Sequence, residues 1–572
     1  MKKRFLLIPF ASMLLSSCFW INDYGGIWFG SHSGAVVEVF YAQRCPIVNL
    51  AEDEYQITGS SLDVYFFDET EDVPYIDLKG FIKSFDGFFE SQNITLESNY
   101  DSTVWRLTYG ETHSVYFDCA ENKITAASYL EFYWFPVAGS STNHNEHLQR
   151  TNDYYFRDST FEVDLDDYGF DLKQGTAHCF LPLFIANTLF CSLCGVNLYC
   201  NWENVYVTVG ETRSLPEYYN CSLNNRNQTR SMRIAAVGSL CFTFDILYGL
   251  KEEKGYTHFD ECIDETTLNL LYSTNSLNNF DAYKNIVYKQ LDELHTRLDL
   301  PSYFCDTSHA KVTNEDYGDF YSEFYERRAI QKELRDAVLT SPEEVRFEDD
   351  MAIITLDSFS VGTIAQIYDE DHNVKDDAWM YDSYHYMHYC MNQIENHGGI
   401  NKIVLDLSLN GGGSLAAMER VAGFMTDDKI PASSYDTLDN EYVIDGYVVD
   451  IDGDDDYEDE DAYDEYDWYL LTGINTFSAA NLMSSTFKDM NLGKIIGKKS
   501  GGGTCSILSL VLADGTGITI SSTYTMRHIE EKENGDKDFI SIEHGIEPDI
   551  DFAYEDFYDS ASLLSVINSI TE

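Results

Sequence analysis

Ser478 is the residue of this sequence best placed to act as a nucleophile. It follows the aromatic and apolar run DWYLLTGINTF, which predicts a strand, and precedes AANLMSSTFKDMN, whose apolar residues recur at helical spacing. A helix N-terminus offers unpartnered N–H groups and partial positive charge, and Ala479 and Ala480 leave room for a substrate. Serine is also a favoured N-cap residue, so this position taken alone favours a plain helix cap.

A glycine-rich turn precedes this serine in the chain. The predicted strand KIVLDL runs into NGGG, with Gly411, Gly412 and Gly413 before a predicted helix. Consecutive glycines let successive N–H groups point into one space, and such a nest stabilises an anion. A Walker-type phosphate loop is excluded because no Lys-Ser/Thr pair follows the glycines. The turn therefore predicts either anion stabilisation or a tight turn without chemistry.

Four segments in this order resemble the landmarks of the S41 serine peptidases, the family of tail-specific, carboxy-terminal processing and tricorn-type proteases. They are VLDLSLNGGG, YLLTGINTFSAANLM, GKIIGKKSGGG and HGIEPDID, and the resemblance covers roughly residues 270–560. It implies an α/β core of the crotonase-like/ClpP-like type with Ser478 as nucleophile. It further implies an oxyanion hole formed by Gly412 or Gly413 together with the N–H of Ala479, and no metal or organic cofactor.

Departures from the family pattern indicate which branch the chain resembles. Processing proteases use a lysine base after the nucleophile, but here KKSGGGTC places Gly503 where that lysine would stand. Lys498 and Lys499 come earlier and fit an exposed turn, which disfavours a Ser-Lys dyad. Ser408 stands where the family often has arginine, and Asn481 where it often has glutamate, so recognition of the substrate end is in doubt.

The tricorn-like branch uses a histidine from the helical segment, and two histidines compete for that role. LDELHTRLDLPSYF resembles the family signature and places His295 as general base, although Glu293-Leu294 replaces Asp-Gly. CDTSHAKV offers His309 as the competing base, and His295 is favoured because the residues after it also fit. Glu543, in SIEHGIEPD, is the predicted carboxylate that orients the imidazole, with a spacing one residue off the expected pattern.

The elements that must position these residues change in character along the chain. Residues 18–260 read as short aromatic strands broken by Gly, Asn and Asp, with two segments that look like related modules. Residues 261–345 have apolar residues at helical spacing and predict a small helical cap. From 346 to 572 strands alternate with helices, which predicts an α/β layered core. The expected fold is thus a strand-rich α+β N-terminal region, a cap and an S41-like core.

The N-terminus predicts export. MKKRFLLIPFASMLLSSC has a basic start, an apolar run too short to span a bilayer and small residues before a cysteine. It resembles a bacterial lipoprotein signal, in which residues 1–17 are removed and Cys18 carries the lipid. The alternative is a plain secretory signal with an incidental cysteine. Either form places the mature protein outside the cytoplasm, and the lipid would tether it to a membrane, at the cell surface or in the periplasm.

Composition makes nucleic acid a poor partner, and one acidic segment leaves calcium as an open ligand. A formal net charge of −60 over 572 residues repels phosphate backbones, so nucleic acid is a poor partner. The segment DIDGDDDYEDEDAYDEYD, residues 450–467, predicts a solvated acidic loop. Calcium binding there stays open, although no register places a glycine at the sixth position of an EF-hand loop.

Two functions follow from these features. The first is an exported, lipid-anchored serine endopeptidase that hydrolyses protein or peptide substrates through a Ser-His(-Glu) acyl-enzyme. The alternative is a non-catalytic surface protein that binds peptide, lipid or glycan on a decayed S41 scaffold, since fold alone does not give function.

Overall fold

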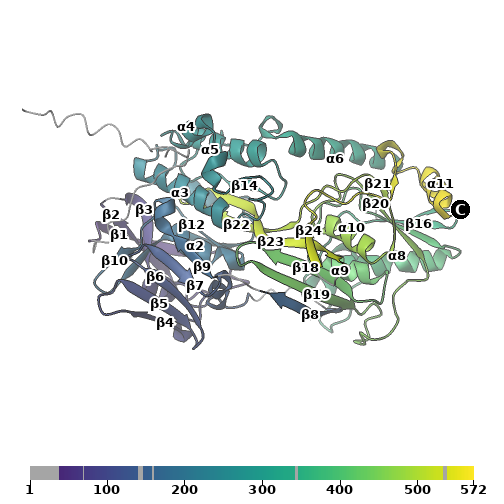
Figure 1. Ribbon diagram of the computed structural model, residues 1–572, viewed down its shortest axis with the longest axis horizontal. Coiled ribbons are helices and arrows are strands. Elements are labelled where there is room, and N and C mark those ends of the chain that lie inside the picture. The colour runs from purple at the N-terminus through teal and green to yellow at the C-terminus, as the bar shows by residue number, and fades with distance from the viewer. Residues whose placement is uncertain are drawn as a thin grey trace, which may run out of the picture.

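The computed structural model describes residues 38–68, 70–139, 146–156, 160–339, 341, 345–532 and 537–571. The molecule is elongated, with the N-terminal strands at one end and the C-terminal helices and strands at the other (Figure 1). The predicted signal peptide and Cys18 lie outside the described residues. In the described part, no helix is long and apolar enough to cross a bilayer.

The N-terminal region is rich in strands, as predicted, and forms two sheets. The larger has the order β10-β11-β3-β2-β1-β13-β12, and only the β1–β13 pair is parallel. The smaller is the antiparallel sheet β4-β5-β6-β7-β9. The bounds are β1 Tyr41–Asn49, β2 Ser61–Phe67, β3 Thr70–Asp77, β4 Ile94–Ser98, β5 Val104–Tyr109, β6 His113–Asp118, β7 Lys123–Ala126, β9 Phe161–Asp164, β10 Lys173–Gln174, β11 Cys179–Pro182, β12 Val196–Cys200 and β13 Val205–Val209.

The two segments that look related in sequence lie side by side. Strand β3 runs into α1 (Leu78–Ser84), β11 runs into α2 (Leu183–Phe190), and β3 and β11 are antiparallel neighbours. Their origin as repeated modules stays a prediction.

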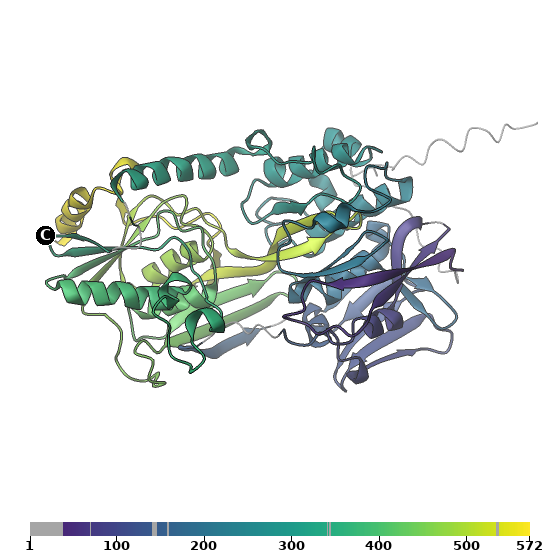
Figure 2. The same ribbon diagram turned by 180° about the vertical axis from the view of Figure 1, so that it is seen from behind.

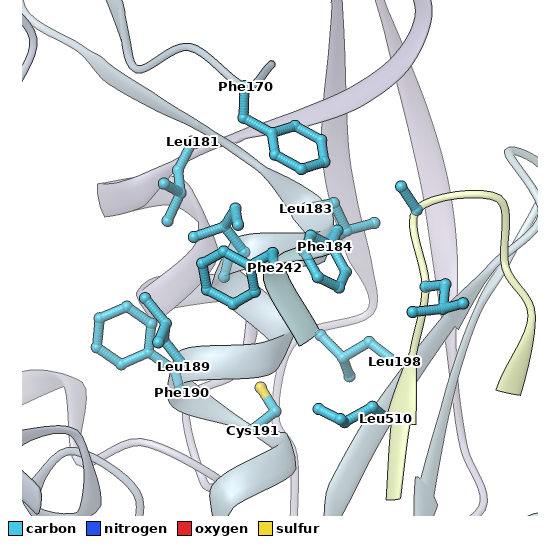
Figure 3. Packing of buried hydrophobic residues seen from close by; sticks show 14 of the residues in the cluster. Phe170, Leu181, Leu183, Phe184, Leu189, Phe190, Cys191, Leu198, Phe242 and Leu510 are labelled. Atoms are coloured by element: carbon cyan, nitrogen blue, oxygen red, sulfur yellow. The ribbon is translucent and has the colours of Figure 1, made fainter. Parts of the chain in front are cut away.

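The main hydrophobic core joins distant parts of the chain. All eight residues of α2 are buried, including the polar residues Asn187 and Thr188. Figure 3 shows Phe184, Leu189 and Phe190 of α2 beside Phe242 of α3 (Arg230–Ile246) and Leu510 of β22 (Cys505–Val511). A strand from the C-terminal half is therefore part of the core of the N-terminal region.

The segment 261–345 divides into two parts. Its first part comprises α4 (Glu265–Leu271), α5 (Ser276–Lys284) and a π-helix (Asn285–Leu291), which pack on the main core. Its second part is the long helix α6 (Asp319–Val338), which runs along one side of the molecule toward the C-terminal end (Figure 2). Helix α6 thereby reaches the loops of the C-terminal sheet.

The C-terminal half contains a six-stranded sheet of order β15-β16-β17-β20-β21-β25, parallel except for the β15–β16 pair. Alternate side chains of β16 enter opposite cores, because successive residues of a strand face opposite sides. Helices thus cover both faces, as parallel sheets require. The bounds are β15 Arg346–Glu348, β16 Met351–Thr355, α7 Ile364–Ile367, α8 Ser383–His397, β17 Lys402–Asp406, α9 Leu415–Gly423, β20 Asp467–Thr472, α10 Ala479–Asp489, β21 Gly493–Gly497, β25 Ile550–Asp551 and α11 Ser560–Thr571.

A third sheet links the two ends and carries the predicted base. Its order is β14-β23-β18-β19-β8, and β22 and β24 also pair with β23. The strand β23 runs between the two ends of the molecule (Figure 1), and β14 begins two residues after His295. The bounds are β8 Leu148–Phe156, β14 Arg297–Leu300, β18 Ile430–Asp436, β19 Glu441–Val449, β23 Gly517–Glu531 and β24 Lys537–Ser541.

Candidate active site

Ser478 occupies a strained turn between β20 and α10. Its φ of 58° and ψ of −123° form a backbone conformation that is costly for a residue with a Cβ atom. Its N–H donates to the carbonyl oxygen of Gly502 at 2.8 Å. Although Ser478 is the N-cap of α10, its side chain makes no capping hydrogen bond. A simple cap role therefore does not account for this serine, and its hydroxyl remains available.

The glycine turn after β17 lies directly against Ser478. A Cβ atom on Gly412 would lie 2.7 Å from the Cβ of Ser478 and 3.0 Å from the nitrogen of Ala479. A Cβ atom on Gly413 would lie 2.1 Å from the carbonyl oxygen of Phe359. The φ values of Gly412 and Gly413 are 103° and 138°, which L side chains rarely adopt. Both positions therefore require glycine.

Two N–H groups beside Ser478 have no acceptor in the part of the chain that the structure describes. The N–H of Gly412 donates to Oδ1 of Asn410 at 2.8 Å and is thus engaged. Within the described residues, the N–H groups of Gly413 and Ala479 have no hydrogen-bond acceptor. Ala479 is the first residue of α10, where a helix leaves its N–H groups unpaired. Of the two glycines predicted for the oxyanion hole, Gly413 is the one with an available donor.

His295 packs against Phe477, the residue that precedes Ser478. Its ring packs on the ring of Phe477, with the centroids 4.8 Å apart and the planes at 57°. The side chain is buried, and burial lowers the pKa of the imidazole while the charge of Glu293 opposes that shift. A buried, neutral imidazole beside the Ser478 turn is suited to accept a proton.

The turn that carries His295 is fixed at several points. Asp292 adopts a left-handed conformation after the π-helix, and its carboxylate accepts the N–H groups of Phe320 and Tyr321 at 2.8 and 3.0 Å. The backbone N–H of His295 donates to the carboxylate of Glu293 at 2.8 Å. The hydroxyl of Thr296 accepts the N–H of Ser521 in β23 at 3.2 Å. The turn is therefore held by both α6 and β23.

Helix α6 also contacts the loops that carry Ser478 and the glycine turn. The amide of Asn475 donates to the carbonyl oxygen of Phe324 at 2.9 Å, and Arg328 donates to that of Leu409 at 2.7 Å. The Phe324 ring packs on Phe477 with centroids 5.9 Å apart. Helix α6 thus contacts the Ser478 turn, the loop before the glycine turn and the turn that carries His295.

The competing histidine lies elsewhere. His309 sits in an exposed loop, where its Nδ1 lies 2.9 Å from a carboxylate oxygen of Asp306 and 2.9 Å from the hydroxyl of Ser308. Its side chain is 70% exposed. Of the two predicted histidines, only His295 has a contact with the Ser478 turn in the described structure.

Glu293 and Glu543 line the same cavity next to the His295 turn. Glu543 accepts the N–H of Thr504 at 2.7 Å, and its pKa is raised to about 8 by burial and by the neighbouring charge of Glu293. Glu293 also accepts the hydroxyl of Ser521 at 3.0 Å. Both glutamates line a cavity of 640 Å³ that also borders Gly501. The sequence noted Glu293 only as a departure from the family signature, but its carboxylate is the one that contacts His295.

The other departures have local explanations. A Cβ atom on Gly503 would lie 2.5 Å from the ring of Phe477, so a lysine does not fit there without rearrangement. Lys498 and Lys499 form surface ion pairs with Asp551 and Glu547 at 2.6 and 3.0 Å, as expected of an exposed turn.

The two residues that replace family charges are structural. Ser408 is buried, and its hydroxyl lies 3.1 Å from that of Tyr558. The amide of Asn481 donates to the carbonyl oxygen of Ile542 at 2.9 Å and accepts the hydroxyl of Ser500 at 2.7 Å. Both side chains hold the loops around the site together.

Asn410 is a positioning residue that the sequence did not single out. It is fully buried, its amide donates to the carbonyl oxygen of Leu356 at 3.0 Å, and its own carbonyl oxygen accepts the N–H of Phe477 at 3.0 Å. With its bond to the Gly412 N–H, Asn410 ties together the loops after β16, β17 and β20. The one sequence feature that could have drawn attention to Asn410 is its position directly before three glycines.

Replacing Asn410 by alanine is expected to lower kcat/KM by roughly 100-fold, because the Gly412 N–H loses its acceptor and the glycine turn can move. The loss should fall mainly on kcat, since Asn410 lies beneath the turn. Steady-state kinetics with a peptide substrate measures both parameters, and Asn392→Ala, on the exposed face of α8, is the control. An unchanged kcat in folded Asn410→Ala protein would refute this positioning role.

The acidic loop does bring carboxylates together. Ligand oxygens of Asp450, Asp452 and Asp454 lie within 4.8 Å of one another. Asp450 already accepts the N–H groups of Gly453 and Asp455 at 2.7 and 3.0 Å. The cluster is thus explained by turn formation and carries no metal assignment.

The C-terminal half of the chain resembles a known protein family. Residues 350–552 match the family model described as Peptidase family S41. No curated protein matches the chain. The solved structures that resemble it include a candidate peptidase from Parabacteroides merdae (18% identity, 58% of this chain and 95% of that one, TM-score 0.39), the photosystem II D1 C-terminal processing protease (18%, 38% and 46%, 0.24) and a lipoprotein from Streptococcus agalactiae (16%, 59% and 96%, 0.34).

The TM-scores of these three structures are below 0.5, so the assignment rests on the family model. The matched residues contain the glycine turn and the Ser478 turn, whereas His295 precedes them. Residues 350–552 therefore form a domain of peptidase family S41 in the C-terminal half of the chain.

Proposed function

We propose that this protein is a serine endopeptidase that hydrolyses protein or peptide substrates through an acyl-enzyme. The observation that carries the proposal is the position of Ser478. Its hydroxyl is not used as a helix cap, and its backbone is strained. The glycine turn lies against Ser478, and the ring of His295 packs on Phe477, the residue before it. Strain of this kind collects at functional sites because surrounding structure must hold it in place.

The proposed reaction begins with proton transfer. His295 accepts the hydroxyl proton of Ser478 while the oxygen attacks a peptide carbonyl carbon. The N–H groups of Gly413 and Ala479 hold the oxygen that becomes negative, and Gly412 leaves space for it beside the nucleophile. His295 then gives the proton to the leaving amine, and a water molecule hydrolyses the acyl-enzyme in a second, equivalent cycle.

The two glutamates have separate roles in this proposal. Glu293 fixes the backbone of His295 by accepting its N–H. Glu543 lines the same cavity as Glu293, and its proposed role is to stabilise the imidazole once it becomes positively charged. Its raised pKa fits a group that gains negative charge most easily when a cation forms nearby. The reaction needs no metal or organic cofactor.

The pH profile tests the role of His295. A general base must be neutral, so kcat/KM falls on the acid side as His295 becomes protonated. Because burial lowers its pKa from 6.5, we expect the acid limb below pH 6.5. Glu293→Gln removes the charge that opposes this shift and should move the limb to lower pH still. Kinetics between about pH 4 and pH 9 measures this, and a limb unmoved by Glu293→Gln would contradict it.

Cleavage of a fluorescein-labelled unfolded protein by the purified mature chain tests the function itself. We expect release of peptides by wild-type protein and none by Ser478→Ala. A folded wild-type protein that neither cleaves this substrate nor reacts with a serine-directed probe would favour the alternative, a binding protein on a decayed S41 scaffold.

The proposal includes the fold subclass and the location. We assign the domain to the crotonase-like/ClpP-like type, with residues 261–345 as its cap. The N-terminal sequence supports export with a lipid on Cys18, which would hold the protein at a membrane.

Replacing Cys18 by serine should release the protein from the membrane fraction into the soluble fraction. The reason is that the lipid on Cys18 is the proposed anchor, and serine offers no thiol to carry it. Fractionation followed by immunoblotting measures this, with the Cys45→Ser variant as control. Persistence of Cys18→Ser in the membrane fraction would refute the lipid anchor.

A further inference from the structure

We infer that a cavity beside the glycine turn binds an apolar side chain of the peptide substrate. The inference rests on the proposed function and adds a substrate preference to it. The cavity has a volume of 580 Å³ and lies between the loop after β16 and the start of α8. Its apolar lining consists of Leu356, Trp379, Met380, Tyr381 and Tyr386.

The cavity is attached to the catalytic turn by backbone contacts. Its lining includes Ser358 and Ser360, which flank Phe359. Phe359 pairs with the glycine turn: its N–H donates to the carbonyl oxygen of Gly412 at 3.0 Å, and its carbonyl oxygen accepts the N–H of Ser414 at 2.9 Å. Since Gly412 lies against Ser478, a peptide on the oxyanion N–H groups would pass close to the cavity mouth.

The walls of the cavity are held in place before any ligand binds. The hydroxyl of Ser383, at the start of α8, accepts the N–H of Ser360 at 2.8 Å and donates to the carbonyl oxygen of Ser358 at 3.2 Å. The ring of Trp379 stacks on Tyr389, with centroids 4.3 Å apart. The hydroxyl of Tyr386 donates to the carbonyl oxygen of Thr355 at 2.8 Å. A preformed wall reduces the ordering cost of binding.

The charges on the wall are already neutralised. Asp357 forms a two-pronged ion pair with Arg335 at 2.6 and 2.9 Å. Asp382 accepts a hydrogen bond from Arg420 at 3.2 Å, and both of these side chains are buried. Neither carboxylate is left to select a lysine or arginine side chain. The remaining contacts are aromatic and aliphatic, which favours an apolar ligand group.

Two of the apolar residues stand at the surface. Met380 is 60% exposed and Tyr381 is 39% exposed, whereas the floor residue Leu356 is buried. A buried floor with an exposed apolar rim fits a site that becomes covered when a peptide binds. Methionine also adapts to side chains of different shape, so we expect a preference for apolar residues as a class.

The test is cleavage-site profiling of a peptide library by mass spectrometry. One position near the scissile bond should be enriched in Phe, Leu, Met or Tyr for the wild-type protein. In Met380→Asp, the ratio of kcat/KM for matched Phe and Asn peptides should fall by roughly 10-fold or more. Because the introduced carboxylate has no paired cation, tolerance of Lys at that position should rise.

Val374→Asp is the matched control. Val374 is 53% exposed and belongs to the same chain segment, but it does not line the cavity. This variant should keep the wild-type ratio for Phe and Asn peptides, and thermal melts would verify that both variants fold. Equal loss of selectivity in Val374→Asp and Met380→Asp would overturn the assignment of the cavity.

The outcome separates this inference from the function on which it rests. Cleavage by the wild-type protein without a preference for apolar residues would overturn the inference and leave the peptidase intact. If the wild-type protein neither cleaves nor reacts with a serine probe, calorimetry with Phe and Asn peptides on Ser478→Ala still decides. Tighter binding of the Phe peptide that Met380→Asp abolishes would support the pocket, and equal binding of both peptides would refute it.

Discussion

Replacing Ser478 by alanine should lower kcat/KM for a peptide substrate by at least about 10⁴-fold, because the acyl-enzyme can no longer form. The fold should be unaffected, since the Ser478 hydroxyl caps no helix and alanine keeps the same backbone atoms. Initial rates of peptide cleavage measure the loss, and thermal unfolding verifies that the variant folds.

Ser485→Ala provides a matched control for this variant. Ser485 lies in α10, seven residues after Ser478, is buried, and donates its hydroxyl to the carboxylate of Asp489 at 3.4 Å. Its replacement should keep cleavage within a few-fold of wild type. If Ser478→Ala cleaves as fast as Ser485→Ala, Ser478 is not the nucleophile, and activity in the preparation comes from another residue or another protein.

Replacing His295 by alanine should have the second-largest effect, a loss of kcat/KM on the order of 10⁴-fold. The Ser478 hydroxyl is a weak nucleophile at its ordinary pKa and depends on a base to remove its proton. The effect should fall on kcat, and no added cofactor should restore it. The measurement is the same peptide assay used for Ser478→Ala.

The two histidines predicted as candidate bases make this test specific. His309 is exposed and bonded to Asp306, so His309→Ala should retain wild-type cleavage. A large loss in His309→Ala with normal cleavage by His295→Ala would reverse the assignment. Loss in neither variant would show that the base is not a histidine from this segment.

Much of the candidate active site could be predicted because the sequence patterns that indicate it are local. The strand, the glycine turn and the following helix are contiguous in sequence, and so are the strand, Ser478 and α10. Each signal depends on residue types at neighbouring positions, which patterns of polarity and glycine report directly. The family resemblance then gave the order of these two turns and the histidine before them.

The remaining features depend on contacts that no local pattern encodes. The sequence leaves Gly412 and Gly413 as equal candidates for the oxyanion hole. What distinguishes them is the hydrogen bond from the Gly412 N–H to the side chain of Asn410. Thr296 and Ser521, whose contact fixes the His295 turn, are 225 positions apart in the chain. Their side chains carry no sequence signal of that pairing.

The core of the N-terminal region was incompletely predicted for a similar reason. An apolar strand such as β22 shows that it will be buried, but not against which partner. Leu510 packs beside α2, more than 300 residues earlier, and β22 thereby joins the N-terminal region to the peptidase domain. The strand-rich character of the N-terminal region, in the part that the structure describes, was predicted correctly from its aromatic content and turn residues.

Labelling of the purified mature protein with a fluorophosphonate, followed by mass spectrometry of its peptides, asks directly whether Ser478 is activated. We expect a single adduct on Ser478 in wild-type protein, and slow or no labelling in His295→Ala. A folded wild-type protein that takes up no probe, or an adduct on another residue only, would contradict the assignment of a catalytic serine at the start of α10.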